Sequence, residues 1–175
     1  MQKSRREIAS VIQRLVVVLL CLAPVAGEAA PRSRIVKDDA AAKIVVYDSL
    51  CDEDNALECL IAEIGCAAPG DFFATVHNLD AKQAAAVFAK ANGKGSVAAG
   101  GASFGLQVSK VALSDYTFNW DVTAVALEKG GEVWKAIWGA SEVQLQAGPK
   151  TVRLQRSDVG EAGYREVVQT CLAGQ

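Results

Sequence analysis

Features that many enzymes and nucleic-acid-binding proteins depend on are scarce in this sequence. It contains one histidine, His77, and has neither a phosphate-binding glycine loop nor a nucleophile elbow. Lys and Arg are spread along the chain without a dense cluster, and the net charge is −2 over 175 residues. This charge pattern argues against nucleic acid or an anionic membrane as the main partner. The missing motifs predict a protein that is not an enzyme and that holds no cofactor or metal.

Long apolar runs are also missing. The longest run covers residues 15–26, which is short of the roughly 20 residues that a membrane-spanning helix needs. It follows several basic residues and precedes the small residues Gly27 and Ala29, which is the order of a secretory signal peptide. The sequence therefore predicts a signal peptide over residues 1–29, a periplasmic or secreted location, and a mature chain that does not span a membrane.

Cysteine is well represented in the expected mature chain, at Cys51, Cys59, Cys66 and Cys171. An even number in an exported chain predicts two disulfides, for which three connectivities exist. A zinc site is the alternative, but close Cys-x-x-Cys pairs are missing. We favour Cys51 with Cys59, because both flank the turn-like region around Asn55, which leaves Cys66 with Cys171.

The segment over residues 57–66 fits two structures. Its apolar spacing suits a helix, with Asn55 and Glu58 placed as a capping box. A strand would complete a hairpin between the flanking cysteines, and we favour the strand. The acidic run at residues 52–54 lacks the glycine and the distal Glu of a calcium loop, which predicts a solvated turn.

A shift of the chain by 48 residues aligns two segments, at about 67–113 and 115–158. The shift places Thr75 on Thr123 and Gly100 on Gly148, and each segment has the pattern strand, helix, strand, strand. The predicted fold is α+β: a mainly antiparallel sheet built from the two repeats, followed by a C-terminal helix and stapled by disulfides. We expect a single globular domain over residues 43–175, preceded by a flexible arm over residues 30–42.

Two tryptophans one helical turn apart raise the question of a ligand platform. Trp134 and Trp138 share the apolar face of the helix expected in the second repeat, where they take the place of Val87 and Phe88 in the first. Aromatic pairs at this spacing carry large apolar area, so we expect both tryptophans to lie in the core.

The other two helices have clear start signals. In the first repeat, Asp80 and Gln83 are spaced as a capping box, and Asp158 and Glu161 repeat that spacing before the C-terminal helix. The expected buried face of the C-terminal helix holds Tyr164, Val167, Val168 and Cys171.

The leading function class is an exported, non-enzymatic binding, accessory or inhibitor protein whose partner is another envelope or secreted protein. The polar run between the repeats is the candidate contact surface, because surface loops carry function and an exposed Tyr favours interfaces. Its candidate residues are Ser114, Asp115, Tyr116 and Asn119.

Two other classes stay open. One is a hydrolase that cleaves envelope glycan through paired carboxylates drawn from Asp115, Asp121 and Glu128. The other is a carrier of a small apolar ligand, which requires the tryptophan helix to line a cavity. His77 lies in the middle of an expected strand, where a structural role is the expectation.

The order of the expected elements, a cysteine-rich strand region followed by strand, helix and paired strands, resembles small exported bacterial proteins of the invasion-associated locus B type. The resemblance is one of layout, and no residue or function is carried over from it.

Overall fold

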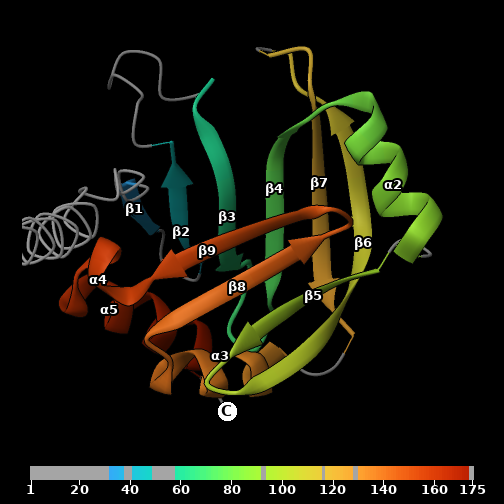
Figure 1. Ribbon diagram of the computed structural model, residues 1–175. Coiled ribbons are helices and arrows are strands. Elements are labelled where there is room, and N and C mark those ends of the chain that lie inside the picture. The colour runs from blue at the N-terminus through green and yellow to red at the C-terminus, as the bar shows by residue number, and fades with distance from the viewer. Residues whose placement is uncertain are drawn as a thin grey trace, which may run out of the picture. The chain divides into compact units, whose positions relative to one another are not determined.

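The computed structural model describes residues 32–37, 41–48, 58–91, 94–115, 117–127 and 130–173, and residues 31–175 form one compact unit (Figure 1). The signal peptide predicted over residues 1–29 lies outside the described residues, as do Cys51, Tyr116 and Glu128. The elements are β1 (Arg32–Lys37), β2 (Ala42–Tyr47), β3 (Leu60–Cys66), β4 (Phe73–Leu79), α2 (Ala81–Ala91), β5 (Lys94–Ala99), β6 (Ala102–Leu113), β7 (Trp120–Ala126), α3 (Gly130–Gly139), β8 (Glu142–Ala147), β9 (Lys150–Gln155), α4 (Arg156–Val159) and α5 (Glu161–Leu172).

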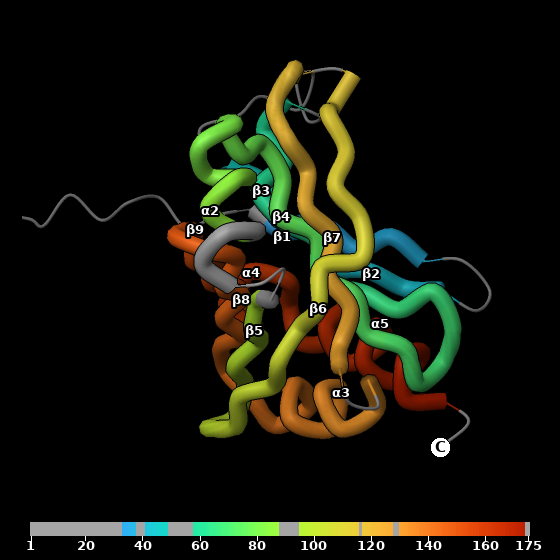
Figure 2. The backbone as a smooth tube through the Cα atoms, turned by 90° about the vertical axis from the view of Figure 1, so that its right-hand side faces the viewer, coloured from blue at the N-terminus to red at the C-terminus, as the bar shows by residue number. Residues whose placement is uncertain are grey.

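The described strands form one antiparallel sheet of nine strands, in the order β1-β2-β3-β4-β7-β6-β5-β8-β9. β6 is the longest strand, and it pairs with β7 along one part and with β5 along another. The sheet curls, so that β8 and β9 cross in front of β3 and β4 in Figure 1 and lie to one side of them in Figure 2. The predicted α+β class with a mainly antiparallel sheet is confirmed.

The core lies inside this curl, because alternate side chains of each strand point inward. Ile44, Ile64 and Val76 are buried on one side of it, and Val143 and Leu145 are buried on the opposing strand β8. Helices α3 and α5 lie at the lower end of the curled sheet in both views (Figures 1 and 2).

The tryptophan helix is where predicted, but only one tryptophan lies in the core. Trp134 is fully buried, its Nε1 donates to the Asp71 carbonyl at 2.6 Å, and its ring packs 5.3 Å from the ring of Phe72. Trp138 is 37 % exposed, beneath the guanidinium of Arg165. The prediction that both are core residues is therefore wrong for Trp138, because α3 turns a narrower stripe toward the sheet than the apolar spacing indicates.

Arg32–Lys37, which lie in the segment predicted as an arm over residues 30–42, form β1 and pair along their whole length with β2. This strand packs Ile35 against the core, close to Gly163 of α5. The mixed charge of this segment does not indicate a strand. An edge strand is held by its hydrogen bonds to the neighbouring strand and by the helix packed on it, so its own composition predicts little. The strand favoured over residues 57–66 is confirmed for Leu60–Cys66.

One of the two predicted capping boxes is confirmed and the other is wrong. At α2, the Asp80 backbone N–H donates to Gln83 Oε1 at 3.0 Å, and the Gln83 N–H donates to Asp80 Oδ1 at 2.7 Å, which is a capping box. Asp158 does not cap α5, because Gly160 adopts φ 80° and separates the short helix α4 from α5. The predicted buried face of α5 is confirmed, and its four members are Tyr164, Val167, Val168 and Cys171.

The predicted disulfide between Cys66 and Cys171 is present and joins β3 to α5 across a sequence separation of 105. Cys59 is also disulfide-bonded. Its predicted partner, Cys51, lies outside the described residues, so that pairing stays a prediction.

The strand register brings together residues that the 48-residue shift relates. Thr75 of β4 lies opposite Thr123 of β7, with their hydroxyl oxygens 3.0 Å apart and 48 residues between them. Val97 of β5 lies opposite Leu145 of β8, at the same separation.

The two glycine turns show the same relation. Gly100 and Gly148 both have left-handed backbones, with φ 57° and 56°. A Cβ at Gly100 would lie 3.1 Å from the Ala136 carbonyl of α3, and a Cβ at Gly148 would lie 3.0 Å from the Val87 side chain of α2. The β5–β6 turn of the first segment thus packs on α3, the helix of the second segment. The β8–β9 turn of the second segment packs on α2, the helix of the first.

The hydroxyl of Tyr164 makes stability depend on pH in the alkaline range. It is buried and donates to the Ile137 carbonyl at 2.6 Å, and burial raises its pKa from 10.0 to about 12. Tyrosine is neutral when protonated, so this contribution is complete below pH 10 and is lost as the pH rises toward 12. We expect the free energy of unfolding to fall by about 1.4 kcal/mol by pH 11 relative to the Tyr164→Phe variant. Urea titrations of both proteins at pH 8 and 11 measure the difference, and an unchanged difference would contradict it.

Candidate functional site

The predicted partner surface is the tip of the β6–β7 hairpin, the highest described part of the domain in Figures 1 and 2. Its ends are joined by a hydrogen bond from the Ser114 N–H to the Asn119 carbonyl at 2.8 Å. The Thr117 N–H donates to Ser114 Oγ at 3.4 Å. Asp115 is exposed, and Tyr116 lies outside the described residues. The structure therefore brings Ser114, Asp115 and Asn119 together in one tight turn.

The turn also carries a highly exposed apolar side chain that the sequence pattern does not indicate. Phe118 is 78 % exposed and adopts φ 55°, and its N–H donates to the Ser114 carbonyl at 3.1 Å. Leu113, at the end of β6, is 50 % exposed. An apolar residue inside a polar run carries no periodic signal, and composition alone made the segment look polar.

His77 lies in a polar cluster within the sheet. Its Nδ1 is 3.2 Å from Asp121 Oδ1, which also accepts the Asn78 N–H at 3.3 Å. Lys150, at the start of β9, donates to the His77 carbonyl at 2.9 Å. Burial lowers the pKa of Lys150, and the nearby Asp121 carboxylate partly opposes that shift. The cluster thus ties β9 to β4 and β7.

The geometry around His77 gives a substrate little access. The His77 side chain is 12 % exposed, and its Nε2 is buried with no hydrogen-bond partner in the described part of the chain. A general base must reach the proton it removes, either directly or through one water molecule. As positioned, the imidazole is better suited to fastening the sheet than to proton transfer with a ligand.

The candidate carboxylates of a hydrolase are placed in different surroundings. Asp121 is engaged inside the sheet by His77 and Asn78, whereas Asp115 is exposed at the hairpin tip. Glu128 lies outside the described residues.

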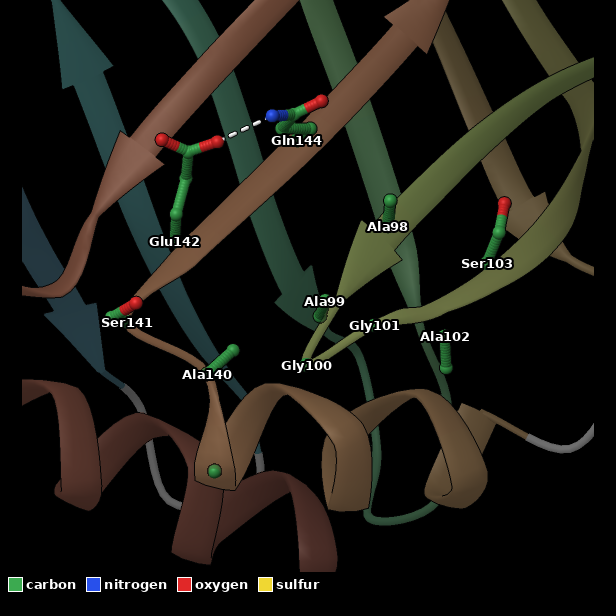
Figure 3. Close-up of a pocket in the computed structure, with 11 residues that line it drawn as sticks. Ala98, Ala99, Gly100, Gly101, Ala102, Ser103, Ala140, Ser141, Glu142 and Gln144 are labelled. Atoms are coloured by element: carbon green, nitrogen blue, oxygen red, sulfur yellow. Dashed lines mark hydrogen bonds between the residues drawn. The ribbon is translucent and has the colours of Figure 1, made fainter.

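An open recess of about 460 Å³ lies between the β5–β6 turn and the end of α3 (Figure 3). Most of its lining is small, including Ala98, Gly101 and Ala140. The Glu142 carboxylate accepts hydrogen bonds from the side-chain amides of Gln144 and Gln155.

Glu142 is held in its charged form. The hydrogen bond from Gln144 is the main cause that lowers the pKa of Glu142, with smaller contributions from Gln155 and the charge of Arg153. An ionised carboxylate at neutral pH has no proton to donate, which argues against a general acid at this position. The recess and the hairpin tip are built from different parts of the sheet.

In the described ranges, no three His, Cys, Asp or Glu side chains are grouped so as to hold a metal ion. No helix of the described segments is long and apolar enough to cross a membrane. Comparison of the chain with protein-family models, with curated proteins and with solved structures gives no match.

Proposed function

We propose that this protein is an exported, non-enzymatic binding module that holds another envelope or secreted protein through the tip of its β6–β7 hairpin. The observation that carries the proposal is the conformation of Phe118: a large apolar ring, 78 % exposed, on a left-handed backbone. A left-handed backbone costs a residue with a Cβ roughly 1–2 kcal/mol. Exposure of the ring brings no compensating burial.

Phe118 therefore lowers the free energy of unfolding, because its strained backbone is not offset by burial of its ring. Backbone outliers of this kind gather at functional positions, so the outlier supports a functional role for the tip. Leu113, at the end of β6, adds exposed apolar area to the tip, and Asp115 adds an exposed charge. An aromatic anchor surrounded by polar groups is the usual composition of a binding hot spot.

The tip is also ordered in advance of binding. Backbone hydrogen bonds from Ser114 to Asn119 and from Phe118 to Ser114 fix its shape. A fixed turn loses little conformational entropy when a partner closes over it, which raises affinity. The partner that this surface suits has an apolar pocket that receives the Phe118 ring.

Site-specific cross-linking in the cell of origin tests the location of the surface. A photoreactive phenylalanine analogue placed at position 118 is expected to capture one envelope protein. The same analogue at position 127 is the control, because Leu127 is 52 % exposed at the opposite end of β7. Equal capture from both positions, or capture from 127 alone, would contradict the proposal.

The Phe118→Asn variant separates stability from binding. Asn tolerates a left-handed backbone, so we expect the free energy of unfolding to rise by about 0.5–1 kcal/mol. The affinity for the captured partner is expected to fall at least about 30-fold, the loss that truncation of a hot-spot aromatic produces. Leu127→Asn is the matched control and is expected to leave affinity unchanged. Urea titration and calorimetry measure the two quantities.

We infer further that the domain arose by duplication of a strand, helix, strand, strand unit, with copies at about 67–113 and 115–158. The support is the register: Thr75 lies opposite Thr123, and Val97 lies opposite Leu145, each pair separated by the same shift. Exchange of the two copies by an approximate two-fold rotation would leave both pairings unchanged. The two glycine turns, each packed on the other copy's helix, support the same relation.

A further inference from the structure

We propose that the β6–β7 connection is a hinge through which two molecules can exchange their second halves, giving a dimer in which β7 to α5 of each chain completes the fold of the other. This goes beyond the proposed function and does not depend on it. The halves are β1 to β6, and β7 to α5.

The interface between the halves is extensive and dominates the fold. β7 pairs with both β4 and β6, and β5 pairs with β8. The Thr75–Thr123 hydroxyl contact and the Cys66–Cys171 disulfide also join one half to the other. Apart from each other, the halves would lose the β4–β7, β6–β7 and β5–β8 pairings, and neither half contains both cysteines of the bridge. A second copy of the chain can supply every one of these contacts with unchanged geometry, because they depend on which half is present and not on which chain it comes from.

The connection itself favours opening. The conformational change that exchange requires lies in the turn between β6 and β7, where the structure describes residues 114, 115 and 117–119. That turn holds Phe118 at φ 55°, and a non-glycine residue there carries strain that an extended backbone removes. Strained short hinges are the sites at which chains exchange elements.

Opening the turn also gives the exposed side chains a place to pack. In the exchanged dimer the two hinge segments run side by side about the molecular two-fold, as an extension of the β6 and β7 strands. Phe118 and Leu113, 78 % and 50 % exposed in the closed chain, then lie near their copies from the other chain. In the exchanged dimer a second hinge therefore covers this apolar surface, so the exchanged form withdraws Phe118 from the partner that binds the monomer.

The disulfide provides a direct readout. Cys66 and Cys171 lie in different halves and are both buried, so exchange converts an intramolecular bridge into an intermolecular one. Unlabelled and ¹⁵N-labelled protein are mixed in equal amounts, reduced, unfolded and refolded together at about 1 mM with glutathione disulfide. Each bridge forms as two cysteine thiols are oxidised and one glutathione disulfide is reduced to two glutathione thiols.

We expect a dimer on gel filtration in which about half of the Cys66–Cys171 cross-linked peptides join a labelled to an unlabelled chain, the fraction that random pairing of exchanged chains gives. Monomer alone at this concentration would overturn the proposal. So would a dimer whose cross-linked peptides are all uniformly labelled or all unlabelled, because that dimer forms through surfaces without exchange.

A variant pair tests whether the turn is the hinge. Phe118→Gly removes the strain and the ring, and we expect the dimer fraction to fall roughly ten-fold. Leu127→Ala trims an exposed side chain away from the hinge and is expected to leave the fraction unchanged. An unchanged fraction in Phe118→Gly would show that exchange does not depend on this turn. Loss of partner binding by Phe118→Asn is measured on the monomer, so the two proposals fail separately.

Discussion

Replacing Trp134 by Ala is expected to lower the free energy of unfolding by about 3 to 5 kcal/mol, the usual loss for a large aromatic removed from a packed core. The side chain is fully buried between α3 and the segment before β4. Its removal leaves a cavity beside Phe72 and leaves the Asp71 carbonyl without its indole donor.

Trp138→Ala is the matched control for this prediction. Trp138 is 37 % exposed, and its main specific contact is with the guanidinium of Arg165 at 5.8 Å from the ring centre. We expect a loss of about 1 kcal/mol, because an exposed cation–π contact contributes about 0.5–1 kcal/mol. Urea denaturation of both variants measures the difference. Equal losses would contradict the described packing of α3.

Removing the Cys66–Cys171 bridge is expected to produce a loss of similar size. The bridge closes a loop with a sequence separation of 105, and the chain-entropy model assigns about 4 to 5 kcal/mol to a loop of this length. The double variant Cys66→Ala with Cys171→Ala avoids leaving a free thiol. Both cysteines are buried, so alanine is a tolerable replacement.

The measurement is the urea midpoint of the double variant beside that of the parent protein, both kept oxidised at Cys59. We expect the midpoint to fall, and α5 to exchange its amide hydrogens faster than α3. A loss under 1 kcal/mol would mean that the packing of Tyr164, Val167 and Val168 holds α5 without help from the bridge.

Much of the fold could be predicted from the sequence because its local signals agree with its tertiary structure. The reciprocal bonds of Asp80 and Gln83 follow from a capping-box spacing, and the buried face of α5 follows from a spacing of three and four residues. The Cys66–Cys171 bridge followed by elimination, after the cysteines that flank a turn were paired.

Where the structure departs from the local sequence pattern, the common physical cause is that tertiary contacts override that pattern. The segment Arg32–Lys37 is a strand because β2 offers it a ladder and α5 covers Ile35. Asp158 has the spacing of a capping box with Glu161 but lies in α4, because the positive φ of Gly160 ends α4 before α5 begins. In neither case does the sequence of the segment contain the contact that decides its structure.

The turn that holds the candidate residues could be predicted from the sequence, whereas its exposed aromatic side chain could not. The position of Ser114, Asp115 and Asn119 between two strand patterns indicates a surface turn, and the structure has one there. Phe118 was missed, because neither its left-handed backbone nor its exposure can be inferred from residue type. Asp121 was considered as a catalytic carboxylate, and its contact with His77 depends on a strand register that sequence patterns leave open.

The central claim is that this protein acts through the hairpin tip and not through a reaction centre at His77. The most direct test compares the affinity for the partner captured at position 118 in three proteins: the parent, Phe118→Asn and His77→Ala. Circular dichroism establishes that all three are folded. We predict that Phe118→Asn weakens binding at least about 30-fold and that His77→Ala binds like the parent. Loss of binding or activity in His77→Ala alone, with Phe118→Asn unaffected, would contradict the account.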